Sequence, residues 1–227
     1  MSALPSPNFG ERRGGARPSL IVLHYTAIAS WAEARAKLCD SAQEVSAHWL
    51  ISEAGAAEAL VDEGQRAWHA GAGEWAGISD VNSHSIGIEL ANTGLQPFAE
   101  PQMAALERLL AGVMDRWQIG PARVIAHSDM APARKSDPGR KFDWRRLALQ
   151  GLSVWPDQQT ADPAALYPAL RRFGYPDAPP DAPPEMLLRA FRLRFRPWAT
   201  GPADAVDAGL AFSLAERFGV DRAAAQA

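Results

Sequence analysis

Three short runs that are apolar at nearly every position constrain this chain more than any other feature. They are LIVL at residues 20–23, SIGIEL at 85–90 and RVIA at 123–126. A strand with one solvated face alternates polar and apolar residues, whereas a strand that is apolar throughout must be covered on both faces. The runs therefore predict buried strands of one sheet with helices on both of its sides.

The segments between these runs supply the covering elements. Apolar residues at helical spacing predict a helix over residues 100–117. Ser30 followed by Glu33 is a capping-box pattern, which predicts a helix from Trp31 onward. Residues 45–52 (VSAHWLIS) predict a further strand, with a turn at Gly55 and a hairpin partner at 59–61. We therefore predict an α/β fold with a mixed central β-sheet flanked by helices.

The chain divides into four segments by composition. Residues 1–18, rich in Pro, Gly and Arg, predict an irregular N-terminal arm, and residues 19–155 form the α/β domain. A linker over 156–163 leads to a helical unit at 164–227, in which residues 164–176, 184–195 and 203–218 predict a small three-helix domain. Because a unit of this size has a marginal core by itself, we expect it to pack against the first domain.

Net charge and cysteine content limit the partners and cross-links that we expect of this chain. The formal net charge of -3 argues against a nucleic-acid partner, which requires a basic face. The arginines at 189, 192, 194 and 196 alternate with apolar residues and predict the solvated face of an amphipathic element. The single cysteine, Cys39, allows no intrachain disulfide.

The location of the protein is also predicted from the sequence. No stretch of about 18 apolar residues occurs, so we expect no membrane-spanning segment and no membrane partner. The first residues lack the basic start and apolar core of a secretory signal, so we expect a cytoplasmic protein, or a periplasmic one if the natural N-terminus is longer. The sequence does not determine the oligomeric state.

Two histidines and one carboxylate lie where the predicted strands end. His24 directly follows LIVL, His127 directly follows RVIA, and Asp137 lies ten residues beyond His127. Strand ends of a buried sheet are where sites are commonly built, so the two histidines are expected to be neighbours in space. Two His and one carboxylate leave a zinc ion a fourth position for water, as catalytic zinc sites do. The alternative is that these are unrelated loop residues.

Two further residues suit amide hydrolysis. Glu89 lies inside the apolar run SIGIEL, where a carboxylate is costly unless it is paired or used, and it could move a proton during the reaction. Lys135 lies two residues before Asp137, so in an extended loop both side chains point the same way. Lys135 is therefore expected to stabilise the oxyanion that forms when the carbonyl becomes tetrahedral.

Five blocks of sequence resemble a known family. They are LIVLHYTA, VSAHWLI, RAWHAG, SIGIEL and VIAHSDMAPARKSDPG, in this order, within residues 6–150. They resemble the type-2 N-acetylmuramoyl-L-alanine amidases, which include bacterial cell-wall recycling amidases, the phage T7-type lysozyme and the peptidoglycan recognition proteins. The resemblance implies a Zn²⁺ cofactor held by His24, His127 and Asp137, with Glu89 as general acid/base, and it places the family's lysine before the last ligand at Lys135.

Other residues are candidates for substrate contact. The resemblance places His69 in the cleft near the zinc ion, with a structural hydrogen bond as the alternative. Trp68 and Trp75 could stack on a sugar face or pack within loops. Arg134 suits a stem-peptide carboxylate or is a solvated side chain. Tyr25 is expected at the border of the site, whereas Asn82 shapes the loop before the Glu89 strand and also touches substrate. His48 is expected to be structural.

The C-terminal unit has a resemblance of its own. The segment LRRFGYP, the proline spacer and LLRAFRLRFRP are similar to three-helix peptidoglycan-binding domains. The pattern is incomplete, because Arg192 stands where glutamine is usual after the phenylalanine. Glycan binding and a purely structural helical cap both remain open for this unit.

The sequence as a whole predicts a zinc amidase that cuts the bond between (1,6-anhydro-)N-acetylmuramic acid and L-alanine. Its expected partner is a muropeptide or peptidoglycan fragment, in cell-wall recycling. The rival function is a peptidoglycan-binding module without catalysis, and cleavage elsewhere in the stem peptide is chemically similar.

Overall fold

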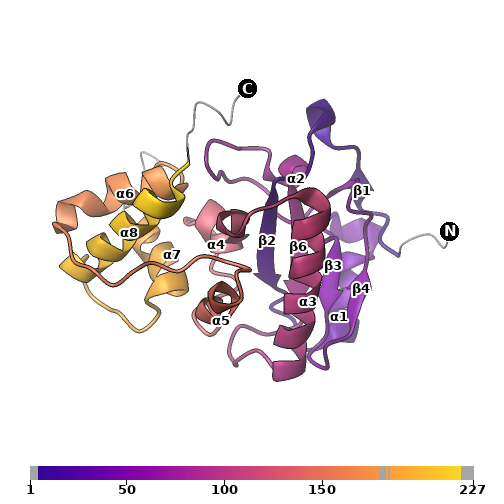
Figure 1. The fold of residues 1–227 in the computed structure, drawn as a ribbon. Coiled ribbons are helices and arrows are strands. Elements are labelled where there is room, and N and C mark those ends of the chain that lie inside the picture. Colours follow the sequence, from indigo (N-terminus) through magenta and orange to yellow (C-terminus); the bar gives the residue numbers. More distant parts are fainter. Residues whose placement is uncertain (1–4, 179–182, 184, 221–227) are drawn as a thin grey trace.

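A five-stranded mixed sheet forms the centre of the computed structural model, which describes residues 5–178, 183 and 185–220 (Figure 1). The strand order is β4-β3-β6-β2-β7. The central strands are parallel, and only β4 runs antiparallel, as the hairpin partner of β3. The strands of this sheet are β2 (Leu20–Tyr25), β3 (Trp49–Ile51), β4 (Ala57–Ala59), β6 (Ser85–Leu90) and β7 (Val124–Ala126).

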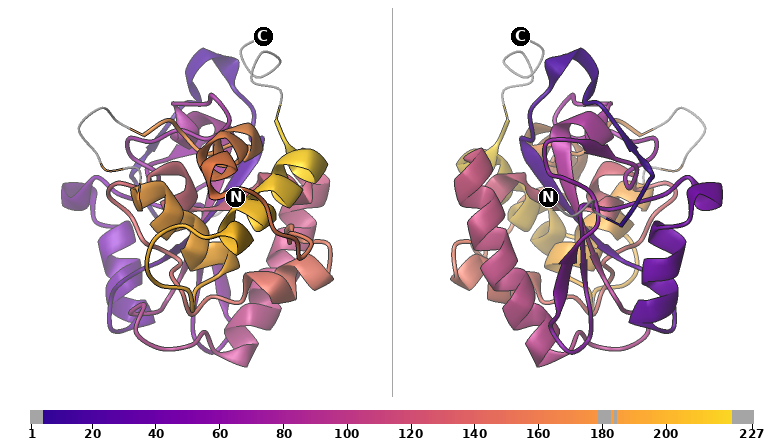
Figure 2. Two further views of the ribbon diagram at one scale, coloured as in Figure 1. Left: turned by 90° about the vertical axis from the view of Figure 1, so that its left-hand side faces the viewer. Right: turned by 90° about the vertical axis from the view of Figure 1, so that its right-hand side faces the viewer.

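Helices cover both faces of the sheet, as the apolar runs predict. Figure 2 shows α1 and α3 on opposite faces. The helices are α1 (Trp31–Leu38), α2 (Val81–His84), α3 (Glu100–Trp117), α4 (His127–Met130), α5 (Trp144–Leu149), α6 (Leu166–Phe173), α7 (Glu185–Phe195) and α8 (Ala205–Phe218). The predicted α/β fold with a mixed sheet is confirmed. Among the described residues, none of the helices has both the length and the apolar character to cross a membrane.

Successive side chains of β2 point to opposite faces of the sheet, and the two faces pack against different cores. Ile21 and Leu23 point into a core that they share with α3 and α5. Leu20 and Val22 point the other way, into a core that contains apolar residues of α6, α7 and α8. His24 is the next residue in this second set, so it emerges on the face opposite α3.

The expected elements match the structure closely where the local signal is strong. β6 and α3 have the predicted bounds, and the Ser30 hydroxyl accepts the hydrogen bond of the Glu33 amide at the start of α1. The strand expected at 45–52 is wrong in extent, because the regular strand is only Trp49–Ile51. Its hairpin partner begins and ends two residues earlier than expected.

The N-terminal arm is more ordered than the composition predicts. β1 (Phe9–Gly10) pairs antiparallel with β5 (Arg66–Ala67) in a second, two-stranded sheet. The buried Asn8 side chain donates to the carbonyl oxygens of Asp40 and Val45, at 2.9 and 2.8 Å. Such side chain to backbone bonds fix a segment that has little regular structure of its own.

The helices α6–α8 pack together beside the β2 side of the sheet (Figure 1). Their apolar residues share one continuous core with Leu20, Val22 and Trp75. Trp75, considered above as a sugar platform, is fully buried and packs edge-on against Phe173 and Tyr175. The stacking role for Trp75 is therefore wrong. The domain boundaries and glycan binding by this unit stay predictions.

Arg189 of α7 is exposed, as expected, but two other arginines of this helix are a correction. Arg192 and Arg194 are buried rather than solvated, at 7% and 2% exposure. Arg192 pairs with Asp207 of α8. The alternating pattern predicts a solvated face for both arginines, because their acidic partners are far along the chain and leave no local sign in the sequence.

Arg194 belongs to a buried network that joins α7 to α4. Its Nη1 donates to Asp129 Oδ2 at 2.6 Å, and the Tyr175 hydroxyl donates to Asp129 Oδ1 at 2.6 Å. The Arg194 guanidinium also lies over the Trp144 ring at 4.2 Å. Burial and the Asp129 charge hold the pKa of Tyr175 well above its usual value, so the hydroxyl stays a donor. The network therefore connects α4, through Asp129, to the C-terminal helical unit.

We expect the substitution Asp129→Asn to destabilise the fold by about 3–5 kcal/mol, because it leaves the Arg194 charge buried without a counterion. Urea unfolding of the metal-free protein measures the effect. Asp177→Asn is the matched control, since its pair with Arg171 is 3.0 Å long but exposed at the surface and contributes less than about 1 kcal/mol. Equal losses in the two variants would contradict a structural role for the network.

Candidate metal centre and active site

The register of the sheet places His24 and Glu89 side by side. β2 and β6 are parallel neighbours in which His24 pairs with Glu89, so both side chains emerge on the same face. β7 lies on the other side of β2 and ends at Ala126, which brings His127, the first residue of α4, to the same edge. The parallel arrangement therefore brings together three functional groups that are far apart in sequence.

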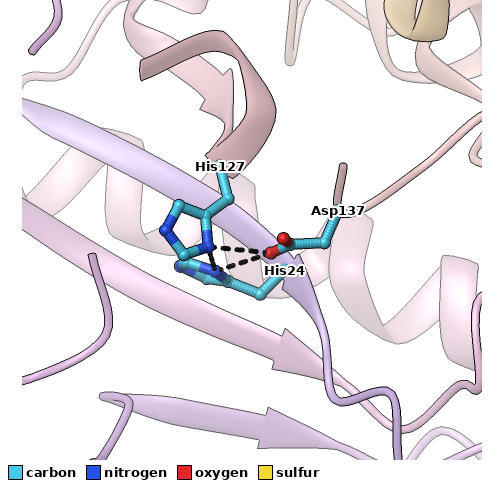
Figure 3. Close-up of side chains that lie close together, drawn as sticks. All are labelled: His24, His127 and Asp137. Atoms are coloured by element: carbon cyan, nitrogen blue, oxygen red, sulfur yellow. Dashed lines mark hydrogen bonds and ion pairs between the residues drawn. The ribbon is translucent and has the colours of Figure 1, made fainter. Parts of the chain in front are cut away.

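The loop after α4 completes the group. The Ser128 amide donates to the Asp137 carbonyl oxygen at 3.0 Å, which ties the loop to α4. Asp137 Oδ2 then lies 3.0 Å from His24 Nδ1 and 3.0 Å from His127 Nδ1, and the two Nδ1 atoms are 2.9 Å apart (Figure 3). All three residues are buried.

The donor set of this triangle fits a metal ion. Ligand atoms bound at about 2.0–2.2 Å around tetrahedral zinc are themselves about 3–3.5 Å apart, close to the spacing here. His127 Nε2 faces the carbonyl oxygen of Ala70 at 2.9 Å, so Nε2 carries the proton of the neutral ring and Nδ1 presents a lone pair to the triangle. Burial and the neighbouring His127 lower the pKa of His24 to about 4, which keeps its imidazole neutral, as a metal ligand must be. The sequence prediction that these three residues lie together is confirmed.

A cleft of about 350 Å³ opens over the triangle. Glu89 and Lys135 line it, as do four of the residues expected near substrate: Tyr25, Trp68, His69 and Arg134. Lys37 of α1 also lines the cleft, although no local signal in the sequence marked it. The volume lies within the range of small-ligand sites.

Glu89 enters the cleft with one oxygen unpaired. Its Oε2 is buried and has no hydrogen-bond partner among the described residues. Burial, and next the Asp137 charge, raise the pKa of Glu89 to about 8, whereas Lys135 lowers it. Lys135 also lowers the pKa of His24, so its ammonium acts on both groups. The cleft thus contains a carboxyl that is ready to exchange a proton and a cation beside it.

Three of the expected substrate contacts already have partners within the protein. The Tyr25 hydroxyl lies 3.1 Å from Ser136 Oγ, and Arg134 Nε donates to the Ala72 carbonyl oxygen at 2.7 Å. Asn82 is a correction: it is buried behind the cleft wall, where its Oδ1 accepts from the amides of residues 69 and 70 at 3.1 and 2.9 Å. The sequence placed Asn82 near the Glu89 strand but gave no sign of which way the side chain points.

His48 is structural, as expected. Its Nδ1 accepts from the Gly87 amide at 2.9 Å, and its Nε2 lies 3.1 Å from the Gln65 carbonyl oxygen. Burial lowers its pKa to about 4, so the ring stays neutral and connects β6 to the loop before β5.

Comparison with known proteins agrees with this geometry. Residues 14–140 match the family model described as N-acetylmuramoyl-L-alanine amidase, and this range contains the triangle, Glu89 and Lys135. The chain belongs to the N-acetylmuramoyl-L-alanine amidases. It is thus a hydrolase, and its buried His-His-Asp group fits a metal site.

Relatives within the family differ in how much of the chain they cover. The amidase AmiD of Escherichia coli is 37% identical over 90% of this chain and 85% of its own length. The 1,6-anhydro-N-acetylmuramyl-L-alanine amidase AmpD of Haemophilus influenzae is 33% identical, over 63% of this chain and 88% of its own length. The match to AmiD thus extends over more of this chain than the match to AmpD does.

Solved structures give the same result. A complex of E. coli AmiD with anhydro-N-acetylmuramic acid-L-Ala-D-γ-Glu-L-Lys superposes with a TM-score of 0.82 at 35% identity, covering 94% of this chain and 99% of that one. AmpDh3 of Pseudomonas aeruginosa, in complex with anhydromuramic pentapeptide, superposes with a TM-score of 0.81 at 31% identity over 97% and 100% of the two chains.

The raised pKa of Glu89 predicts how the stability of the metal-free amidase varies with pH. The folded state holds the Glu89 proton up to pH about 8 and the unfolded chain only to about 4.5, so folded protein loses stability as the pH rises between these values. Glu89→Gln removes this loss. We expect the variant to be more stable than the unsubstituted protein by up to roughly 5 kcal/mol at pH 9, and equal to it near pH 4.

Chemical unfolding with chelator present, at several pH values, measures this difference. Glu58→Gln is the control, because Glu58 lies on the edge strand β4, outside the cleft, where its carboxylate pairs with Arg35 of α1. A stability difference for Glu89→Gln that stays constant with pH would refute the raised pKa.

Proposed function

We propose that this amidase uses zinc to hydrolyse the amide between the lactyl group of 1,6-anhydro-N-acetylmuramic acid and L-alanine in soluble cell-wall fragments. The convergence of His24 Nδ1, His127 Nδ1 and Asp137 Oδ2 at the floor of the cleft is the observation that carries this proposal. Two nitrogen ligands and one carboxylate are typical of catalytic zinc.

His24, His127 and Asp137 would hold the zinc ion. When bound, zinc would supply Lewis-acid activation of the scissile carbonyl and of the attacking water. As metal ligands the two histidines would be neutral, so Asp137 would contribute the one negative charge of the donor set.

Glu89 moves the proton in this proposal. In its ionised form the Glu89 carboxylate takes a proton from the attacking water, and the new C–O bond makes the carbonyl carbon tetrahedral. The same carboxyl then gives the proton to the L-alanine nitrogen as the C–N bond breaks. The products are the lactyl carboxylate of the sugar and a stem peptide with a free amine. The Lys135 ammonium stabilises the negative charge that develops on the carbonyl oxygen.

The charges of the cleft wall suit an acidic peptide. Lys37 lies on α1, and Arg134 and Lys135 lie on the loop that leads to Asp137. A γ-linked glutamate leaves a free α-carboxylate one residue after L-alanine, and a cation on either wall can pair with it. The ligands of the AmiD and AmpDh3 complexes, both anhydro-muramyl peptides, support this substrate class.

The proposal includes cell-wall recycling in the cytoplasm as the setting. Recycling implies that small fragments with an anhydro end are better substrates than intact wall. Fractionation of cells that produce the protein, with an antibody against the purified chain, would locate it, and recovery in a periplasmic or envelope fraction would contradict the cytoplasmic setting.

Digestion of defined muropeptides tests the function. Purified protein is incubated with N-acetylmuramyl-L-alanyl-γ-D-glutamyl peptides, with and without the 1,6-anhydro end, and with polymeric sacculi. We expect chelator-sensitive release of a peptide that begins at L-alanine, faster from the anhydro substrate, as detected by mass spectrometry. Failure to cleave any substrate with zinc demonstrably bound would favour a binding module, and cleavage elsewhere would indicate a stem peptidase. Preference for sacculi would refute recycling.

The two cleft residues are expected to give separable kinetic defects. Glu89→Gln loses the proton carrier and should reduce kcat by about 10²–10⁴-fold, while the zinc content stays at one per chain. Lys135→Met should reduce kcat by about 10²–10³-fold with little change in metal content. Zinc analysis alongside steady-state kinetics makes the comparison. Loss of zinc in either variant would mean that the residue supports the metal site instead.

A further inference from the structure

The dipeptide His69–Ala70 contacts both histidines of the metal triangle on the side away from the triangle. His69 Nδ1 lies 3.0 Å from His24 Nε2, and the Ala70 carbonyl oxygen lies 2.9 Å from His127 Nε2. The His24 and His69 rings meet edge to face, with their centroids 5.1 Å apart. One two-residue segment therefore supplies the outer hydrogen-bond partner of each imidazole.

The tautomer of His24 follows from a chain of hydrogen bonds that ends at a backbone carbonyl. Ser85 Oγ lies 2.6 Å from the Val81 carbonyl oxygen, which can only accept, so the hydroxyl proton points there. Ser85 Oγ then offers only lone pairs to His69 Nε2, 3.1 Å away, so His69 carries its proton on Nε2.

The neutral His69 ring consequently has a bare Nδ1. This atom accepts a hydrogen bond from His24, which must carry its own proton on Nε2 and present Nδ1 as a lone pair. The Ala70 carbonyl oxygen imposes the same tautomer on His127 directly. Both rings therefore turn the lone pair of Nδ1 toward Asp137 Oδ2. Three acceptor atoms then face one another without a hydrogen between them, and a bound cation would remove the repulsion between their lone pairs.

The dipeptide is itself fixed by contacts with neighbouring elements. Asn82 Oδ1 accepts from the amides of both His69 and Ala70. The His69 ring lies against β6 at Gly87, where a Cβ atom would come within 2.4 Å of the ring. Arg134 Nη2 also donates to the Ala70 carbonyl oxygen. Hydrogen bonds from Asn82 of α2, from Ser85 of β6 and from Arg134 thus all reach His69 or Ala70.

We propose that His69–Ala70, held by Asn82 and Ser85, is a positioning element that sets both His24 and His127 in the Nε2-protonated tautomer for binding zinc through Nδ1. The inference rests on zinc as the metal of the proposed function. It differs from the expectation that His69 and Asn82 contact substrate. Partners of this kind that orient metal ligands typically contribute about 10- to 100-fold to metal affinity.

Three variants of the full chain test the role of His69. His69→Phe keeps a ring but has no acceptor for His24 Nε2, whereas His69→Gln restores an acceptor oxygen. His84→Phe is the matched control, because His84 lies on α2 and bonds the Asp80 carbonyl oxygen outside the cleft. Zinc affinity is measured by competition with a chromophoric chelator, and the His24 tautomer is read from long-range ¹H–¹⁵N spectra of the metal-free protein.

We expect His69→Phe to bind zinc about 10- to 100-fold more weakly and to show mixed His24 tautomers. His69→Gln should recover most of the affinity, and His84→Phe should match the unsubstituted protein. Ser85→Ala removes the hydrogen bond between Ser85 and His69, and it should weaken zinc binding severalfold. This variant replaces His69→Phe in the test if His69→Phe proves too unstable to study.

Other outcomes separate the hypotheses. Unchanged affinity and unchanged tautomer in both His69→Phe and Ser85→Ala would overturn the positioning role. A raised KM with unchanged zinc affinity would assign His69 to substrate binding and would also overturn it. If the unsubstituted protein itself fails to bind zinc, the proposed function fails first, which is a distinguishable result.

Discussion

The parallel pairing of β2 with β6 on one side and β7 on the other is the constraint on which the rest of the structure depends. It places the carboxyl ends of three strands at one edge, and the register pairs His24 with Glu89. A shift of one residue would send either side chain to the opposite face, into the core under α3. The apolar residues that precede each functional group fix the register, because they must face their own cores.

The metal triangle depends on support from outside the strands. α4, which begins with His127, is only one turn long and has little stability of its own. Asp129 in this turn receives hydrogen bonds from Tyr175 and from Arg194, both contributed by the C-terminal unit. The helical unit is therefore part of the framework of the active site, whether or not it also binds glycan.

The site concentrates groups that the fold by itself would disfavour. Three acceptor atoms meet within about hydrogen-bond distance, and Glu89 keeps a buried oxygen without a partner. Such an arrangement lowers the stability of the metal-free protein, and it persists because the surrounding core holds the backbone in place. The same unsatisfied groups are those that a metal ion, a water molecule and a reacting carbonyl would use.

The sequence by itself determined the buried strands, the long helix α3 and the three metal ligands. These depend on local patterns: apolar runs, helical periodicity and the family blocks around His24, His127 and Asp137. Local signals also placed Glu89 and Lys135, because a charge inside an apolar run or beside a ligand is visible without a fold.

Only the tertiary structure decided what the remaining polar residues do. The sequence left Trp75 between a sugar face and loop packing, left Asn82 between loop shaping and substrate contact, and assigned Arg194 to solvent. All three are buried, and Trp75 and Arg194 have their partners, Tyr175 and Asp129, far along the chain. A hydrogen bond between residues 46 or 65 positions apart leaves no periodic trace, because it is set by how elements pack and not by the propensity of either segment. The direction of each imidazole was decided in the same way, by the carbonyl and hydroxyl oxygens that the fold brought behind it.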